Sequence, residues 1–215
     1  FCTMARKKTD KIVFENVEVL DAGAKGVCVA KAPDGKVIFI PNVVPGDVVD
    51  VQTVKKRKAY YEGRATQVHT FSEHRVEPVC EHFGSCGGCK WQNMAYSQQL
   101  VYKQQEVYNH LKRIGKIELP EFDPILGSKE QFFYRNKMEF SFSNARWLTP
   151  EEIQSGEELG KENALGFHIP KMWDKILDIK KCWLQGDPSN DIRNEIREFA
   201  NQHQMEFFNP RENTG

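Results

Sequence analysis

The sequence has no long apolar run and no excess of charge of one sign. Thirty basic residues balance thirty acidic ones over 215 residues, and no stretch approaches the roughly 18 consecutive apolar residues of a transmembrane helix. The first eight residues are polar and basic, unlike a secretory signal. Cysteine is also scarce, because six residues are too few for a small disulfide-held scaffold. We therefore expect a cytoplasmic protein of one or two domains.

Positive charge is concentrated in one part of this neutral chain. Residues 1–64 carry twelve Lys and Arg against eight Asp and Glu. The densest basic run is Lys55-Lys56-Arg57-Lys58, and Tyr60 follows it closely. Such a run is most simply a solvated turn. Cations beside aromatic rings also suit RNA, because cations bind phosphates and rings stack on bases.

The N-terminal third of the chain reads as an all-β domain. Short apolar segments are separated by glycine and proline, and Asp34-Gly35 is a strong hairpin signal. This pattern predicts a small closed barrel of OB type. A β-domain of no special function is the simpler interpretation at this point. The predicted strands are residues 12–20, 26–31, 36–40, 48–55 and 60–69.

The rest of the chain reads as an α+β domain. Apolar residues at three- and four-residue spacing predict a helix over residues 93–115. Alternation predicts a strand over 134–143 with Arg135 and Lys137 on its polar side. Further predicted elements are strands at 165–169 and 175–179, an acidic loop at 151–162, and a helix that opens at Asp187-Pro188.

Four cysteines are the strongest candidates for chemistry. Cys80, Cys86 and Cys89 lie within ten residues of one another, and the three glycines among them relax the backbone. Cys182 follows a predicted strand, from which it can fold back onto the other three. In a reducing compartment such a cluster binds metal more often than it forms disulfides. Four thiolates suit either zinc or an iron–sulfur cluster. Cys28, in an apolar stretch, is expected to be a small buried residue.

Taken together, these features resemble the RNA uracil-5-methyltransferases, specifically the branch that methylates 23S ribosomal RNA and carries a cluster. The stretch from Gly26 to Asp47 resembles a TRAM domain, an OB-like RNA-binding barrel. The pattern Cys80-x5-Cys86-Gly-Gly-Cys89 with a distant Cys182 resembles the four ligands of a [4Fe–4S] cluster in that family. Residues 134–140 and 165–168 resemble the family's central domain.

Two groups of relatives fit less well. Radical S-adenosylmethionine methylthiotransferases also combine a TRAM domain with a cluster, but their cysteines follow a Cys-x3-Cys-x2-Cys pattern and their TRAM domain comes last. The tRNA-directed members of the superfamily resemble this chain less, because they lack both the TRAM domain and the cluster. The resemblance therefore favours ribosomal RNA as the substrate.

The resemblance implies two domains, a TRAM barrel over 8–70 and a cluster-bearing central domain over 71–215. It also implies S-adenosylmethionine as methyl donor, a cysteine that attacks C6 of uracil, and a carboxylate that removes the C5 proton. No strand, glycine-rich loop and helix unit for the cofactor follows. We therefore expect the Rossmann-like catalytic domain, the cofactor site and both catalytic residues to lie beyond Gly215. The second domain would then be incomplete, the helix at 93–115 would pack on the missing domain, and this chain would be inactive alone.

The expected partner is 23S ribosomal RNA, with no DNA and no membrane. We expect a monomer that can associate through the exposed apolar helix. The alternative is a non-catalytic RNA-binding module with a structural four-cysteine zinc site. An electron-transfer protein is a third hypothesis, but it would not need a TRAM barrel. The predicted RNA-binding residues are Lys55, Lys56, Arg57, Lys58 and Tyr60 of the barrel with Arg135 and Lys137 of the central domain.

Overall fold

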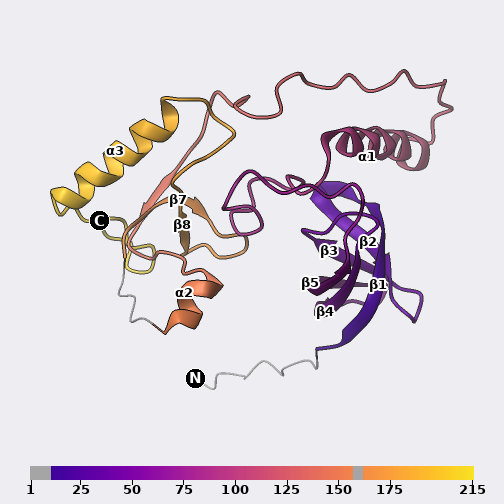
Figure 1. Ribbon diagram of the computed structural model, residues 1–215, viewed down its shortest axis with the longest axis horizontal. Coiled ribbons are helices and arrows are strands. Elements are labelled where there is room, and N and C mark those ends of the chain that lie inside the picture. The colour runs from indigo at the N-terminus through magenta and orange to yellow at the C-terminus, as the bar shows by residue number, and fades with distance from the viewer. Residues whose placement is uncertain (1–10, 157–161) are drawn as a thin grey trace. The chain divides into compact units, whose positions relative to one another are not determined.

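The computed structural model describes residues 11–156 and 162–215, and these form two compact units (Figure 1). The first unit comprises the chain up to Glu77 together with Lys90–Gly127, and the second comprises Pro78–Cys89 together with Ser128–Gly215. The chain thus crosses between the units three times. The domains predicted at 8–70 and 71–215 stay a prediction, and residues 8–10 lie outside the described ranges.

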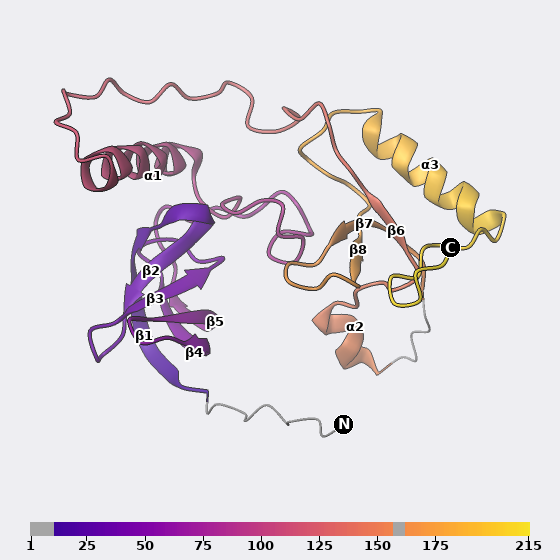
Figure 2. The same cartoon turned by 180° about the vertical axis from the view of Figure 1, so that it is seen from behind.

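A closed five-stranded barrel lies in the first unit, as the short apolar segments and turn residues of the sequence predict. Its strands follow the order β1-β2-β3-β5-β4 around the barrel, with β3 and β5 parallel and the other neighbours antiparallel (Figure 2). This order has the partly Greek-key character of an OB fold. The strands are β1 Val13–Ala22, β2 Val27–Lys31, β3 Val37–Pro41, β4 Val48–Lys56 and β5 Tyr60–Thr70.

Alternate residues of each strand fill the barrel. Cys28 pairs with Ile40 across β2 and β3, and both side chains are fully buried. Burial of one such aliphatic side chain contributes about 1.5–3 kcal/mol. Gly63 of β5 is needed for close packing, because a Cβ there would overlap with Cγ1 of Val51.

A buried carboxylate joins the barrel to the segment that follows it. The carboxylate of Asp47 accepts hydrogen bonds from the backbone N–H of Val44 at 2.7 Å and of Ser72 at 2.9 Å. Arg75 also donates to it, through Nε at 3.2 Å. The charge is thereby paired and bonded, as a fully buried carboxylate requires.

Helix α1 (Tyr96–Asn109) belongs to the first unit and continues into a π-helical turn, His110–Ile114. Every residue of α1 is at least partly exposed. Gln104, the polar interruption of its apolar face, binds the following segment, because its Oε1 accepts from Ile125 N at 2.9 Å. Tyr108 packs edge-on against Phe122 of that segment.

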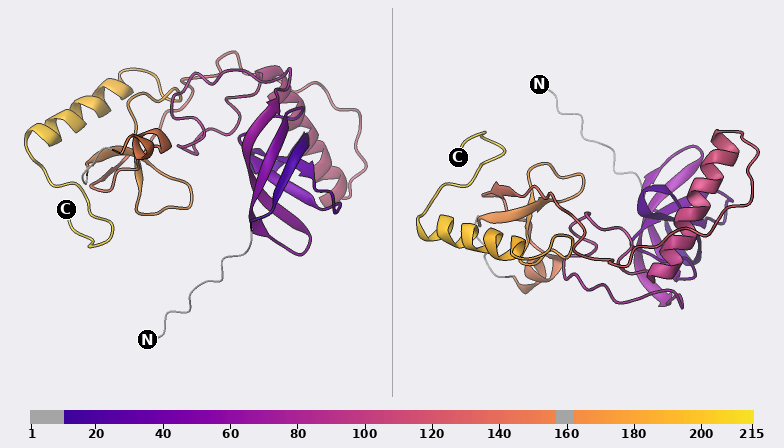
Figure 3. Two further views of the ribbon diagram at one scale, coloured as in Figure 1. Left: turned by 60° about the horizontal axis from the view of Figure 1, so that its bottom comes forward. Right: turned by 90° about the horizontal axis from the view of Figure 1, so that it is seen from above.

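The second unit contains a three-stranded sheet in the order β6-β7-β8, with helix α3 against β7 (Figure 3). The strand predicted over 134–143 is much shorter, because only its last three residues pair with a neighbouring strand. Residues 134–140 instead form an extended segment with isolated bonds, such as Arg135 N to Leu184 O at 2.8 Å. The elements are β6 Ser141–Ser143, α2 Pro150–Ser155, β7 Ala164–His168, β8 Ile176–Asp178 and α3 Ser189–Gln202.

The acidic stretch predicted as a loop begins with a helix. The Oγ1 of Thr149 accepts from Glu152 N at 3.3 Å, and the Glu152 side chain accepts from Thr149 N at 2.8 Å. This reciprocal capping box starts α2. Arg146 then pairs with Glu152 and with Glu162. Residues 157–161 of the predicted loop lie outside the described part of the chain.

Helix α3 buries its polar face. Asn190 and Arg193 are 5% and 3% exposed, whereas Ile192, Ile196 and Phe199 are about half exposed. An ordinary surface helix has the opposite arrangement. Polar side chains of α3 therefore lie in the interior of the second unit.

Across the described residues, none of the helices has both the length and the apolar character that a membrane crossing requires.

Candidate metal centre and RNA-binding surface

Three of the predicted cysteines lie on an irregular loop, residues 78–89 of the second unit. Turn hydrogen bonds shape this loop, from Phe83 N to Cys80 O and from Cys86 N to His82 O, both at 3.0 Å. Gly87 has a φ of +70°, and a Cβ there would overlap with Cγ of Pro170. Glycine at this position lets the cysteine loop lie directly against the loop that carries Pro170.

Cys182 lies far along the sequence but shares the environment of this loop. It is buried in an apolar cluster with Ile179 and Leu184. Cys86 and Cys89 pack against the same cluster. The fold therefore gathers these thiols from two separate segments of the chain.

The four thiols influence one another electrostatically. Burial raises the pKa of Cys86 above the ordinary thiol value, and the thiolate charges of Cys89, Cys80 and Cys182 raise it further. Burial likewise raises the pKa of Cys80. None of the five cysteines of the described ranges forms a disulfide. Such mutual effects require closeness, so the structure brings the four predicted cysteines into one neighbourhood.

The neighbourhood is not a finished metal site. Within the described ranges, no three or more cysteine, histidine or acidic side chains are arranged so that they could hold a metal ion as they stand. The ligand role of the four cysteines stays a prediction.

A polar network on α3 lies directly behind Cys182. The side-chain amide of Asn190 accepts from Cys182 N at 2.7 Å and donates to Cys182 O at 3.1 Å. Arg193 donates to Ile179 O at 3.0 Å and to the Asn190 Oδ1 at 3.0 Å. Its Nη1 is buried and has no hydrogen-bond partner among the described residues. Burial lowers the pKa of Arg193.

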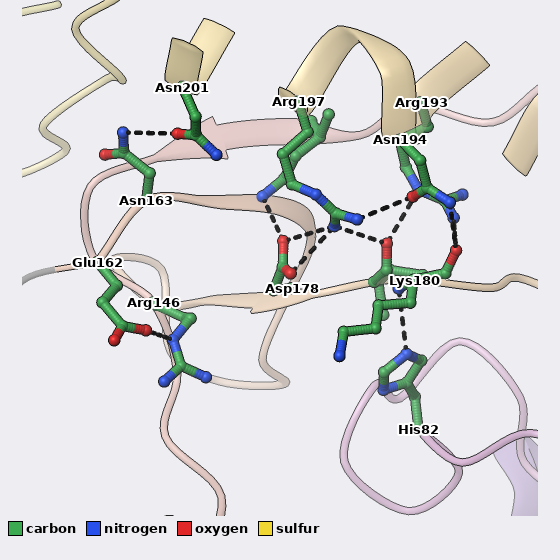
Figure 4. Close-up of polar contacts among 12 residues, drawn as sticks. His82, Arg146, Glu162, Asn163, Asp178, Lys180, Arg193, Asn194, Arg197 and Asn201 are labelled. Atoms are coloured by element: carbon green, nitrogen blue, oxygen red, sulfur yellow. Dashed lines mark hydrogen bonds and ion pairs between the residues drawn. The ribbon is translucent and has the colours of Figure 1, made fainter. Parts of the chain in front are cut away.

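The same network reaches the cysteine loop and β8. Arg197 Nη1 lies 3.0 Å from each carboxylate oxygen of Asp178 (Figure 4). The Nε2 of His82, on the cysteine loop, accepts from Lys180 N at 3.4 Å. Sequence reasoning missed these side chains. The polar spacing of Asn190, Arg193 and Arg197 was visible, but without the fold it predicts a solvated helix face.

The predicted barrel cations lie on the hairpin between β4 and β5. Lys55, Lys56, Arg57 and Lys58 are all exposed, and Arg57 N donates to Tyr60 O at 2.9 Å to close the turn. Lys55 Nζ lies 3.3 Å from Glu62 Oε2. The ring of Tyr60 packs edge-on against Phe39, with centroids 5.3 Å apart, so it is partly committed to the barrel surface.

The two predicted cations of the second unit are not on a strand. Arg135 and Lys137 are exposed on the extended segment before β6, and Lys137 pairs with Glu139 at 2.7 Å. The prediction that a strand aligns them is wrong, because none of the described strands pairs with residues 134–140. Their contact with RNA stays a prediction.

Comparison with known proteins agrees with the barrel. Residues 15–66 match the TRAM domain family. An uncharacterized RNA methyltransferase of Bacteroides thetaiotaomicron is 53% identical over 192 residues, which are 89% of this chain and 42% of that protein. One of Porphyromonas gingivalis is 44% identical, over 93% of this chain and 44% of that protein. The chain thus spans less than half the length of these curated relatives.

A solved structure shares the fold. The Pyrococcus abyssi tRNA (uracil-54, C5)-methyltransferase in complex with S-adenosyl-L-homocysteine aligns with a TM-score of 0.57 at 23% identity, over 93% of this chain and 40% of that one. The resemblance to RNA methyltransferases is thereby confirmed. The chain carries a TRAM domain and is homologous to proteins of that name.

Three related expectations are wrong. We expected a chain that lacks the catalytic domain, is inactive alone, and has its S-adenosylmethionine site elsewhere. The likeness to a solved methyltransferase covers 93% of the chain, and a relative named RNA methyltransferase covers 89% of it. Those expectations depended on a missing glycine-rich motif and on the position of Gly215, and neither observation is enough to support them. The placement of the two catalytic residues beyond Gly215 stays a prediction.

The choice of ribosomal RNA as substrate stays a prediction, because a likeness of fold at 23% identity does not bear on which RNA this chain uses.

Proposed function

We propose that the protein methylates C5 of uracil in RNA, with S-adenosylmethionine as methyl donor and 23S ribosomal RNA as substrate. The observation that carries the proposal is the closed barrel, whose residues 15–66 match the TRAM domain in a chain homologous to RNA methyltransferases. The structural neighbour is a uracil C5 methyltransferase in complex with S-adenosyl-L-homocysteine, the demethylated product of S-adenosylmethionine. That complex supports uracil C5 as the target and S-adenosylmethionine as the donor. A cytoplasmic location agrees with this substrate.

RNA binding in this proposal rests on phosphate contacts by exposed cations. Lys55, Lys56, Arg57 and Lys58 supply four charges on one hairpin, and Tyr60 offers a ring beside them. Arg135 and Lys137 supply further charge from the second unit. Phosphate contacts release counterions, so affinity should fall steeply with salt.

A [4Fe–4S] cluster on Cys80, Cys86, Cys89 and Cys182 completes the proposal. Four cysteine thiolates are the ordinary donor set of such a cluster. The apolar surroundings that Cys86, Cys89 and Cys182 share support the assignment. When bound, the cluster would supply iron–thiolate crosslinks. The residues of the chain would fix the ligands, since Asn190 holds the backbone of Cys182 on both sides.

The test combines metal analysis with a methylation assay. Purified protein, isolated without oxygen, should contain iron and acid-labile sulfide. Incubation with methyl-labelled S-adenosylmethionine and transcripts of 23S ribosomal RNA should yield 5-methyluridine in nucleoside mass spectrometry. Product from tRNA transcripts alone would overturn the ribosomal substrate. RNA binding with zinc in place of iron and no methylation would favour the alternative, a non-catalytic RNA-binding module with a structural zinc.

A further inference from the structure

The second unit has a hollow that the proposed function does not use. Its volume is about 570 Å³, within the range of roughly 300–1,000 Å³ for sites that take small organic groups. Residues of β6, the end of β7, the loop before β8 and the segment near residue 208 line it. The lining side chains that matter here are Phe142, His168, Trp173, Asp174, Ile176 and Phe208.

The walls of this hollow are unusually aromatic for an exposed surface. Trp173 is 65% exposed, Phe208 43% and Phe142 36%. Phe142 is held in place by an edge-on contact with Phe207, at 5.0 Å between ring centroids. Ile176, which is buried, adds to the apolar lining. Large apolar groups gathered at one exposed hollow commonly mark a binding site.

Polar side chains also line the hollow. His168 Nε2 lies 3.4 Å from the hydroxyl oxygen of Ser141, and both residues line the hollow. Imidazole and hydroxyl groups can each donate or accept a hydrogen bond. They could therefore meet the polar edge of a flat, aromatic ligand.

Charged groups lie near the hollow. Its acidic lining residue, Asp174, accepts from Arg211 through Nη2 at 2.7 Å and Nε at 2.9 Å. This bond lowers the pKa of Asp174 and pairs its charge. Lys171 and Lys175 lie two residues on either side of Trp173 in the chain, and Glu212 follows Arg211. Three cations therefore lie near the hollow with two carboxylates, and of these five residues only Asp174 lines it.

We propose that this hollow binds one unstacked base of single-stranded RNA, with Trp173 as the stacking ring. Aromatic faces stack on any base, and neighbouring cations hold the flanking phosphates. Aromatic walls with lysines close to Trp173 in the chain suit a base joined to phosphates. This inference rests on the proposed RNA substrate and adds to it a second contact, apart from the barrel hairpin.

The test compares two RNAs and three variants of the protein by fluorescence anisotropy. The probes are a labelled oligouridylate of about ten nucleotides, within the ~4–16 nucleotides of typical single-strand sites, and the same backbone without bases. Trp173→Ala should weaken binding of the oligouridylate by about 5- to 150-fold, the range for loss of one stacking ring. Trp173→Phe should restore most of it. Phe199→Ala, at a residue 56% exposed on α3 and outside the hollow, should change nothing.

The outcomes separate this inference from the function on which it rests. Binding of the base-free backbone should be equal for wild type and Trp173→Ala, because only phosphates are held. If wild type binds oligouridylate and Trp173→Ala binds it equally well, the base site is refuted while RNA binding stands. Equal losses for both probes would also refute it, since stacking would not be the cause. If wild type binds neither probe nor structured RNA, the proposed function fails as well. Trp173 is exposed, so an unchanged thermal transition should accompany its replacement.

Discussion

Asn190 binds both backbone polar groups of Cys182 with its own side chain. Its Oδ1 accepts from Cys182 N at 2.7 Å, and its Nδ2 donates to Cys182 O at 3.1 Å. The amide is buried, so water cannot replace these bonds. The side chain of Asn190 on α3 thus fixes the backbone of Cys182, the fourth cysteine of the candidate centre.

Asn190→Leu should lower the free energy of unfolding by about 2–5 kcal/mol, because it leaves two buried backbone groups without partners. Urea denaturation followed by circular dichroism measures this. Asn194→Ala is the control, since Asn194 is less buried; it donates to Lys180 O at 3.1 Å and accepts from Arg197 Nη2 at 2.9 Å, and it holds no backbone group of Cys182. A loss for Asn190→Leu no larger than that of the control would show that the network is not stabilising.

Gly63→Ala should destabilise the barrel by about 1–3 kcal/mol, the usual range for overpacking. The added methyl would overlap with Val51 Cγ1, where two strands meet. Gly186→Ala, whose nearest neighbour would be Phe133 Cβ at 3.9 Å, should stay within about 0.5 kcal/mol of wild type. Equal thermal transitions for the two variants would contradict this close packing of β4 and β5.

Asp34 should titrate at unusually low pH. Hydrogen bonds from Lys36 and Tyr61 lower the pKa of its carboxyl group from 3.8 to about 2. Because the folded pKa lies below the unfolded one, the stabilisation is present above about pH 4 and is lost as pH falls toward 2. Carboxyl chemical shifts in NMR would report the midpoint. Tyr61→Phe removes one donor and should move the midpoint upward, whereas an unchanged midpoint would exclude that bond as a cause.

The cysteines should differ in reactivity. Burial raises the pKa of Cys28 to about 12, and its Sγ contacts Val43 O at 3.1 Å. In native protein treated with a chelator, iodoacetamide at pH 8 should therefore alkylate Cys80, Cys86 and Cys89 long before Cys28, because the thiolate is the nucleophile. Peptide mass spectrometry gives the order. Early labelling of Cys28 would mean that the barrel opens under native conditions.

The barrel hairpin should govern the salt dependence of RNA binding. Replacement of Lys55, Lys56, Arg57 and Lys58 by glutamine should flatten the slope of log K against log[salt] by up to ~3, at about 0.7 per phosphate contact on single strands. A matched variant removes four other exposed cations of the same unit and should leave the slope unchanged. An equal effect from both variants would indicate non-specific charge. The control cations are Lys103, Lys112, Arg113 and Lys116.

The barrel was predictable because its information is local. Short apolar segments between glycine and proline, and the turn at Asp34-Gly35, specify strands and a hairpin without reference to the rest of the chain. The strand over 134–140 failed for the opposite reason, because alternation shows that a segment is extended but not that a partner lies beside it. The capping box of Thr149 and Glu152 could have predicted the start of α2, but the acidic character of the stretch favoured a loop instead.

Of the candidate centre, the sequence predicts only the four cysteines, and their ligand role stays a prediction. Cysteine spacing singled out the four thiols, but nothing in the sequence links Asn190 or Arg193 to Cys182. A polar helix face normally predicts solvent exposure, and only the fold shows that this face is turned inward. The hollow at Trp173 is likewise made by segments distant in sequence, so no local pattern could reveal it.

The threefold crossing of the chain between its two units has a practical consequence. Residues 78–89 leave the barrel unit at Glu77 and return to it at Lys90. Neither unit is therefore one uninterrupted stretch, and no single cut in the backbone yields both as intact pieces. Truncation at a simple domain boundary would deprive one unit of part of its own chain. Fragments of this protein made by limited proteolysis or by truncating the gene should therefore keep both segments of a unit together.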